Sequence, residues 1–109
     1  MKFDKINFVL NVLSSEVVLK GKQNLIKLFI VDSIADTQIS EVEYKLQIND
    51  GRTATILVKD WATLEQLGDF FTDTYIPTFT NKSNIELLVR ITDTDDNIYA
   101  MSHNLQGVL

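Results

Sequence analysis

The chain has 109 residues, of which 45% are hydrophobic and 23% are charged; this suits one folded domain, 1–109, and argues against disorder. Its net charge of −5 is uneven, at +3 over residues 1–30, −2 over 31–59 and −6 over 60–109, so phosphate backbones would be repelled and we expect no nucleic-acid binding. The absence of cysteine excludes disulfides, thiolate zinc sites and thiol nucleophiles.

The first third of the chain predicts three strands. From Phe3 to Leu13 apolar residues recur at every second position, and Val9 and Leu13 add a second apolar side, which predicts a strand buried on both faces for part of its length. Glu16 to Lys20 predicts a short strand that ends in a turn. Asn24 to Asp32 is a short, almost continuous apolar run, which favours a central strand over a helix.

The middle of the chain predicts a hairpin from Val42 to Val58. Apolar side chains alternate with polar ones as far as Ile48, and the alternation resumes at Ala54. Between them Asn49-Asp50-Gly51 suits a tight turn, since Gly accepts positive φ freely and Asp or Asn tolerates it.

Residues 63–71 have two interpretations. Leu64, Leu67, Phe70 and Phe71 share one face at helical spacing, which predicts a short helix near 63–71. Gly68 inside that segment weakens a helix, so an irregular strand followed by a crossover is the alternative. Farther on, Pro77 cannot donate to a ladder and marks the end or edge of a strand.

The last part predicts two more strands. From Ile85 to Ile91 apolar residues recur at every second position, which predicts a strand. Asp93 to Asn97 predicts a turn, and Ile98 to Leu105 predicts the last strand. Seven to eight strands at this spacing are typical of an all-β, antiparallel sandwich.

The segment Ile85 to Ala100 resembles the final hairpin of immunoglobulin-like and fibronectin type III-like bacterial domains, and Val42 to Val58 is similar to their third and fourth strands. The chain lacks the paired cysteines of antibody domains, and its only Trp, Trp61, follows the middle hairpin instead of lying in its first strand. The resemblance implies an immunoglobulin-like sandwich that is adhesive, structural or partner-binding, and that is no enzyme.

The polar residues give no catalytic set. Asp93, Asp95 and Asn97 have the spacing of calcium ligands, but Ile98 stands where such a loop needs Gly. A hairpin turn is favoured there, and whether Asp93, Asp95 and Asp96 bind a weak surface calcium stays open. His103, the only histidine, has no predictable relay partner, and a surface or edge position is favoured. We therefore expect no catalytic residue, metal or cofactor.

Aromatic residues concentrate between positions 61 and 75, and aromatic anchors are enriched at protein interfaces. For Phe70 and Phe71 we favour a role in closing the core. For Trp61 and Tyr75 a core position and a surface position are about equally favoured. If this segment covers a sheet edge, the partner-binding residues are Trp61, Phe70, Phe71 and Tyr75.

The sequence therefore predicts a non-catalytic protein-binding or assembly module that binds a protein partner, or itself, through a sheet face or edge. The first strand and the strand 52–60 are the candidate edges. One alternative is a small acidic intracellular inhibitor, similar to an immunity protein, of a basic partner. Another is a carbohydrate-binding module with Trp61 and Tyr75 as its platform.

The start of the sequence bears on location. The apolar stretch Ile6 to Leu13 is too short and too polar for a signal peptide or a membrane span. We expect no membrane insertion and slightly favour the cytoplasm, with removal of a leader before this sequence as the other option.

Overall fold

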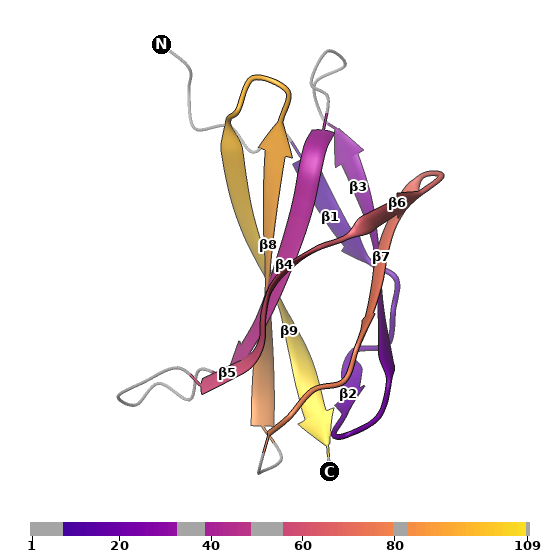
Figure 1. The fold of residues 1–109 in the computed structure, drawn as a ribbon, viewed down its shortest axis with the longest axis vertical. Coiled ribbons are helices and arrows are strands. Elements are labelled where there is room, and N and C mark those ends of the chain that lie inside the picture. Colours follow the sequence, from indigo (N-terminus) through magenta and orange to yellow (C-terminus); the bar gives the residue numbers. More distant parts are fainter. Residues whose placement is uncertain (1–7, 33–38, 49–55, 80–82, 109) are drawn as a thin grey trace.

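The computed structural model describes residues 8–32, 39–48, 56–79 and 83–108. Within these ranges the chain forms nine strands and no helix, hence none that could cross a membrane (Figure 1). The strands are β1 (Phe8–Val12), β2 (Val17–Leu19), β3 (Asn24–Asp32), β4 (Ile39–Ile48), β5 (Ile56–Thr63), β6 (Glu65–Leu67), β7 (Phe70–Tyr75), β8 (Ser83–Asp93) and β9 (Ile98–Val108).

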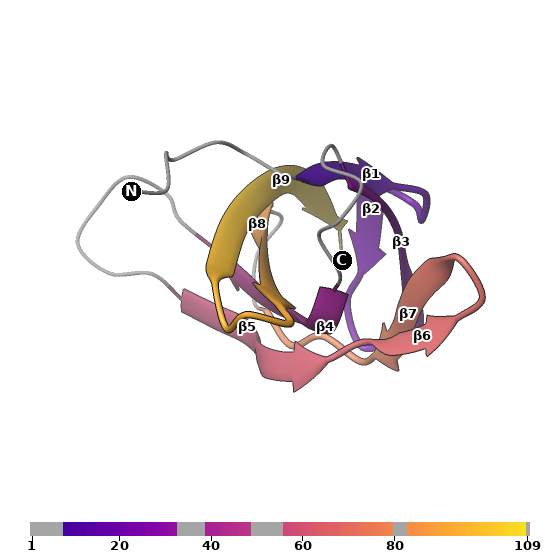
Figure 2. The same cartoon turned by 90° about the horizontal axis from the view of Figure 1, so that it is seen from above.

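The strands form two sheets that face each other (Figure 2). The four-stranded sheet has the order β1-β3-β7-β6, and the five-stranded sheet has the order β2-β9-β8-β4-β5. All pairs are antiparallel except β2 with β9, which is parallel. The predicted edge positions of the first strand and of the strand 52–60 are confirmed over their described residues, because β1 and β5 end their sheets.

The core lies between the sheets and is built by strict alternation. In β4 and β8 every second side chain is buried, since successive residues of a strand point to opposite faces. Tyr44 lies at its centre with no exposed surface, and its hydroxyl donates to Asp73 Oδ2 at 2.6 Å. The strands expected at 42–48 and 85–91 are confirmed as parts of β4 and β8, and the strand expected at 98–105 as part of β9.

The prediction of a first strand buried on both faces is wrong for its described part. In β1 only the inner side is covered, while Val9 is 53% exposed and Leu13, just after the strand, is 52% exposed. β3 is central, as expected, but its second apolar side is also uncovered, with Leu25 51% and Val31 39% exposed. A strand buried on both faces needs a covering layer, and no described segment lies over the outside of this sheet.

The helix considered for 63–71 is also wrong. The extended backbone of the alternative is confirmed, but the crossover at Leu64 precedes the strands β6 and β7 instead of following them. Leu64 is buried and its N–H donates to Val42 O at 2.8 Å, so the chain stays extended as it passes from the five-stranded to the four-stranded sheet (Figure 1). β6 then turns into β7 through Gly68, whose φ of 62° suits a residue without Cβ. The helical spacing of apolar residues arises because two short strands meet at this turn.

Two predicted boundaries are confirmed. β7 ends at Tyr75, two residues before Pro77, which lacks the N–H that a ladder needs. β8 and β9 are joined by the predicted turn, in which Asp96 has a φ of 64°. The turn predicted at Asn49 to Gly51 lies outside the described residues.

Candidate interaction surfaces

The four aromatic residues between 61 and 75 do not share one surface. Phe71 and Tyr75 are each only 6% exposed and belong to the core. Phe70 is half-buried on the outer side of β7, and Trp61 is half-buried on the outer side of β5, in the other sheet. A binding surface made of all four is therefore excluded, because successive residues in a strand face opposite ways and the crossover at Leu64 separates Trp61 from the rest.

The outer side of the four-stranded sheet carries an uncovered apolar surface, which we call the apolar face. It consists of seven residues that are exposed or half-buried: Val9, Leu13, Leu25, Phe29, Val31, Leu67 and Phe70. Val9 pairs with Val31, and a second row runs Asn11, Phe29, Phe70, Leu67 across all four strands. The rings of Phe29 and Phe70 lie 6.0 Å apart. Contiguous apolar surface of this kind is uncommon on a monomer and marks interaction sites.

Two charged residues of opposite sign lie within the apolar face. The neighbouring row runs Lys27, Thr72, Glu65 across β3, β7 and β6. Lys27 Nζ lies 4.3 Å from the centre of the Phe70 ring, so the ammonium sits above the apolar surface instead of at its rim. Glu65 is exposed on the short edge strand. The two charges cancel, although the chain as a whole carries −5.

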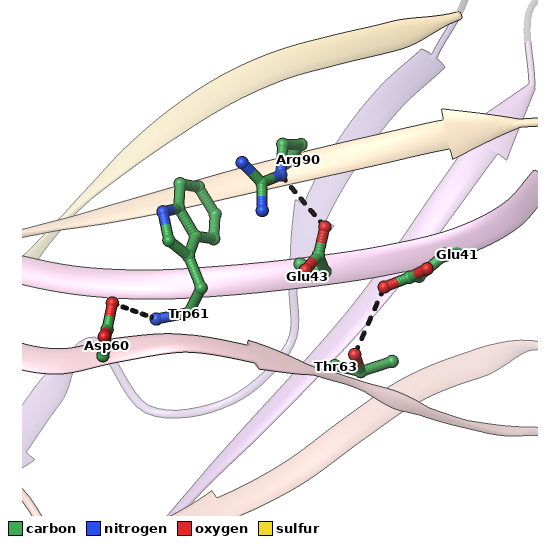
Figure 3. Close-up of polar contacts among 6 residues, drawn as sticks. All are labelled: Glu41, Glu43, Asp60, Trp61, Thr63 and Arg90. Atoms are coloured by element: carbon green, nitrogen blue, oxygen red, sulfur yellow. Dashed lines mark hydrogen bonds and ion pairs between the residues drawn. The ribbon is translucent and has the colours of Figure 1, made fainter. Parts of the chain in front are cut away.

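The outer side of the five-stranded sheet is mainly polar, and its exposed large apolar residues are separated on β2 (Val17, Leu19), β5 (Leu57) and β9 (Ile98). It contains a cluster around Trp61, the indole cluster (Figure 3). The Arg90 guanidinium lies 4.1 Å from the centre of the indole ring, and Lys45 Nζ lies 5.8 Å from it. Glu43 Oε1 accepts a hydrogen bond from Arg90 Nε at 3.0 Å and holds the guanidinium in place. One face of the ring is thus occupied by a cation and is not free to stack on a sugar.

β5 departs from regular pairing beside this cluster. The register with β4 shifts between Tyr44 and Leu46, where two residues of β5, Asp60 and Trp61, lie opposite the single residue Lys45 of β4. Asp60 Oδ1 accepts from the Trp61 N–H at 2.8 Å, so part of this edge is satisfied by its own side chain (Figure 3). A bulge twists an edge strand and interrupts its ladder, which makes this part of β5 a poor template for an added strand.

The turn between β8 and β9 is organised by Asp93, which is 2% exposed. Its Oδ1 accepts the N–H groups of Asp95 and Asn97, both at 2.9 Å, and its Oδ2 accepts Asn97 Nδ2 and the Tyr99 hydroxyl at 3.2 and 2.9 Å. The favoured hairpin-turn interpretation is confirmed. Both oxygens that calcium would need are engaged, and the described residues hold no group of three or more carboxylates or histidines placed for a metal ion.

His103 lies on β9 and Ser102 beside it is exposed on the opposite side, as expected from strand geometry. The His103 ring nitrogen Nε2 lies 3.1 Å from Glu16 Oε1, and His103 is half-buried. Sequence spacing could not predict this pair, because the two residues meet through the parallel pairing of β2 with β9. The pair joins Glu16, the residue before β2, to the neighbouring strand β9.

No protein-family model matches the chain, and the search of curated proteins found no match either. Solved structures do match. The soluble domain of PmoD from Methylocystis sp. is 9% identical with a TM-score of 0.58, over 93% of this chain and 90% of that one. A superoxide reductase (neelaredoxin) from Ignicoccus hospitalis is 8% identical with a TM-score of 0.55, over 91% and 80%. A cohesin module from Clostridium perfringens is 12% identical with a TM-score of 0.50, over 94% and 98%.

These likenesses show the fold, which is an all-β, immunoglobulin-like sandwich of two sheets. At such identities they carry no activity from the neighbours to this chain.

Sequence reasoning missed the apolar face. Its signal was the almost continuous apolar run of β3, which predicts a central strand and is typical of strands covered on both sides. The same run fits a strand with one covered and one uncovered apolar side, and only the position of the other strands separates the two. Phe70 is the one predicted binding residue that lies on this face.

Proposed function

We propose that this domain is a non-catalytic module that binds protein through its apolar face. The observation that supports the proposal is the contrast between the two outer sides of the sandwich. One is mainly polar, with its exposed apolar residues separated on β2, β5 and β9, and bears the indole cluster, while the other has a contiguous apolar surface with one charge of each sign. Since burial of apolar area is the main favourable term in protein association, the uncovered side is the one that gains from a partner.

The physical chemistry of the face also indicates what kind of ligand fits. The outer side of a four-stranded sheet is an open, gently twisted surface, which suits another protein surface and not a small molecule, since a small molecule needs a concave site. Phe29 and Phe70 at its centre are rigid aromatic anchors of the type that dominates interface energetics. Acting as a binding module needs no catalytic residue.

The proposal is tested by affinity capture with matched variants. Leu67→Lys places a charge on the apolar face at a side chain that is 54% exposed, so the fold should survive. Ile98→Lys is the control, since Ile98 is 63% exposed on β9 of the other sheet. Both are checked by circular dichroism and thermal unfolding.

We expect the wild type and Ile98→Lys to retain the same bound protein at low and high salt, and Leu67→Lys to lose it. Retention by Leu67→Lys would contradict the proposal. Loss of the bound protein from the wild type at high salt would contradict it too, since it would favour the acidic inhibitor of a basic partner.

A further inference from the structure

We infer that the apolar face binds a second copy of this chain, in a two-fold symmetric dimer in which the four-stranded sheets pack face to face. This inference rests on the proposed function and names its partner. Support for the dimer comes from the arrangement of charges on the apolar face, because any partner that covers this face has to match these charges.

The position of Lys27 sets the first limit. Its ammonium lies over the Phe70 ring, near the middle of the apolar face. A purely apolar partner would bury this charge without a counter-ion, which is costly. The occupant must therefore be an apolar surface that offers a carboxylate opposite Lys27.

The same face contains a carboxylate in the position required. Lys27 and Glu65 lie in one row, on β3 and β6, the two strands that flank β7 on either side. A two-fold axis parallel to β7 and above it places β7 against β7 and β3 of each copy opposite β6 of the other. Lys27 then faces Glu65 of the second copy, and the reverse contact forms by symmetry, as in any isologous interface.

The apolar row is complementary under the same operation. Phe70 meets Phe70 of the second copy, and Phe29 meets its Leu67. A two-fold axis perpendicular to the strands keeps each strand opposite itself, so Lys27 never meets Glu65. The charges therefore select the axis parallel to the strands, and the apolar row is complementary about that axis. Sheets that pack in this way lie about 10 Å apart, which the side chains on these strands fill.

The expected affinity is modest. The overlap covers β3, β7 and the three residues of β6, whereas β1 lies beyond it. Interfaces smaller than about 1,200 Å² in total are mostly weak or transient, so we expect a dissociation constant in the micromolar range. The dimer is thus detected by titrating concentration.

The test is sedimentation equilibrium of the purified chain over about 5 to 500 μM, a range chosen around that affinity. It uses the wild type, Lys27→Glu, Glu65→Lys, and an equimolar mixture of these two variants. Each single variant opposes like charges twice per dimer, and we expect about tenfold weaker association or more. In the mixture a variant of one kind pairs with the other, and both contacts again join opposite charges, so association should return.

Two controls carry the same charge changes elsewhere. Lys22→Glu lies in the exposed turn after β2, and Glu41→Lys lies on the outer side of the five-stranded sheet. Both should associate like the wild type. A general effect of net charge would weaken or strengthen them as much as the variants on the face.

A wild type that stays monomeric throughout overturns the inference, and so does a dimer that the face variants and their mixture do not alter. The proposed function is judged separately. If the chain is monomeric but Leu67→Lys still loses a captured protein that Ile98→Lys keeps, the apolar face binds another protein. If neither occurs, both proposals fail.

Discussion

The hydroxyl of Tyr44 and the carboxylate of Asp73 join the two sheets by a hydrogen bond of 2.6 Å. Tyr44 lies on β4 of the five-stranded sheet and Asp73 on β7 of the four-stranded sheet. Because Tyr44 has no exposed surface, its hydroxyl has no access to water. The bond fixes the lateral position of one sheet over the other, which apolar contacts alone do not specify.

Removing this hydroxyl should destabilise the domain. Tyr44→Phe keeps the ring and leaves Asp73, which is half-buried, able to bind water. Hydrogen bonds to charged groups contribute about 1.5 to 3 kcal/mol, and we expect a loss of that size in the free energy of unfolding. Urea denaturation measures it, and an unchanged m value shows that the unfolding transition is comparable. A loss below about 0.5 kcal/mol, typical of a surface substitution, would contradict the role assigned to the bond.

Stability should fall in alkaline solution because of two buried tyrosines. Burial raises the pKa of Tyr75 to about 12. Burial, followed by the hydrogen bond to Asp73 and its negative charge, raises the pKa of Tyr44 far above its usual value. Unfolded tyrosines ionise near pH 10, so above that pH the unfolded chain releases protons that the folded chain keeps.

The contribution of each buried tyrosine to the free energy of unfolding is therefore fully present below about pH 10. Above that pH it is lost by about 1.4 kcal/mol per pH unit for each tyrosine. Urea denaturation at a series of alkaline pH values should give this slope. In the variant with both Tyr44→Phe and Tyr75→Phe the slope should be smaller. Equal slopes for the two proteins would assign the effect to other groups.

Asp93 should make the β8–β9 turn sensitive to acid. Burial alone would raise the pKa of this carboxyl, but the hydrogen bonds from Asn97, Tyr99 and the Asp95 N–H outweigh burial and hold the pKa below its usual value. Its stabilising contribution is present above the usual pKa of an aspartate and is lost as the pH falls towards the folded value.

Asp93→Asn replaces one accepting oxygen by an amide donor, which the donors of Asn97 and Tyr99 cannot use. We expect a lower melting temperature at neutral pH and a smaller difference from the wild type at low pH, where the wild-type carboxyl is protonated. Thermal unfolding from acid to neutral pH checks this. A constant difference across that range would show that charge is not involved.

Much of the fold follows from the sequence, and the reason is alternation. In β4 each apolar residue is flanked by polar ones, and β8 departs from this pattern only at Leu88, so one side must be buried and both the strand and its inner side can be predicted. Pro77 and the Asp93 turn likewise act through their own backbone chemistry. Features that depend on a few neighbouring residues were predictable in this chain.

Features that depend on where distant strands lie were not predictable. β6 was open to a helical interpretation because its apolar spacing mixes residues from two strands and a turn. The apolar face was missed because a run that is apolar on both sides does not reveal whether a second layer covers it. The split between Trp61 and Phe70 depends on the crossover at Leu64, which local spacing does not encode.

Gly107 is required by packing in the core. A Cβ at this position would lie 2.8 Å from Ile85 Cδ1 and 3.2 Å from the Phe79 ring. Overpacking typically costs about 1 to 3 kcal/mol, and we expect Gly107→Ala to destabilise the domain within this range. Adding Ile85→Val removes the nearest methyl group and should recover part of the loss. A double variant whose loss equals the sum of the two single losses would show that the contact is relieved in another way.

The indole cluster offers a spectroscopic test, since Trp61 is the only tryptophan. Arg90→Met keeps an apolar stem and removes the guanidinium over the ring. We expect Trp61 fluorescence to become more accessible to acrylamide, with a stability change of about 1 kcal/mol or less because the pair is partly exposed. Lys20→Met, in the turn after β2, is the control. Unchanged quenching in Arg90→Met would mean that Arg90 does not cover the ring in solution.

The parallel pairing of β2 with β9 has a consequence for how the domain is made. Residues 17–19 form their ladder with residues 106–108, so one edge of the five-stranded sheet joins segments from opposite ends of the described chain. During synthesis β2 has to wait for β9 before it can join its sheet, and closing so long a loop is an entropic barrier. β2 is thus among the earliest synthesised strands of the domain and among the last to be secured.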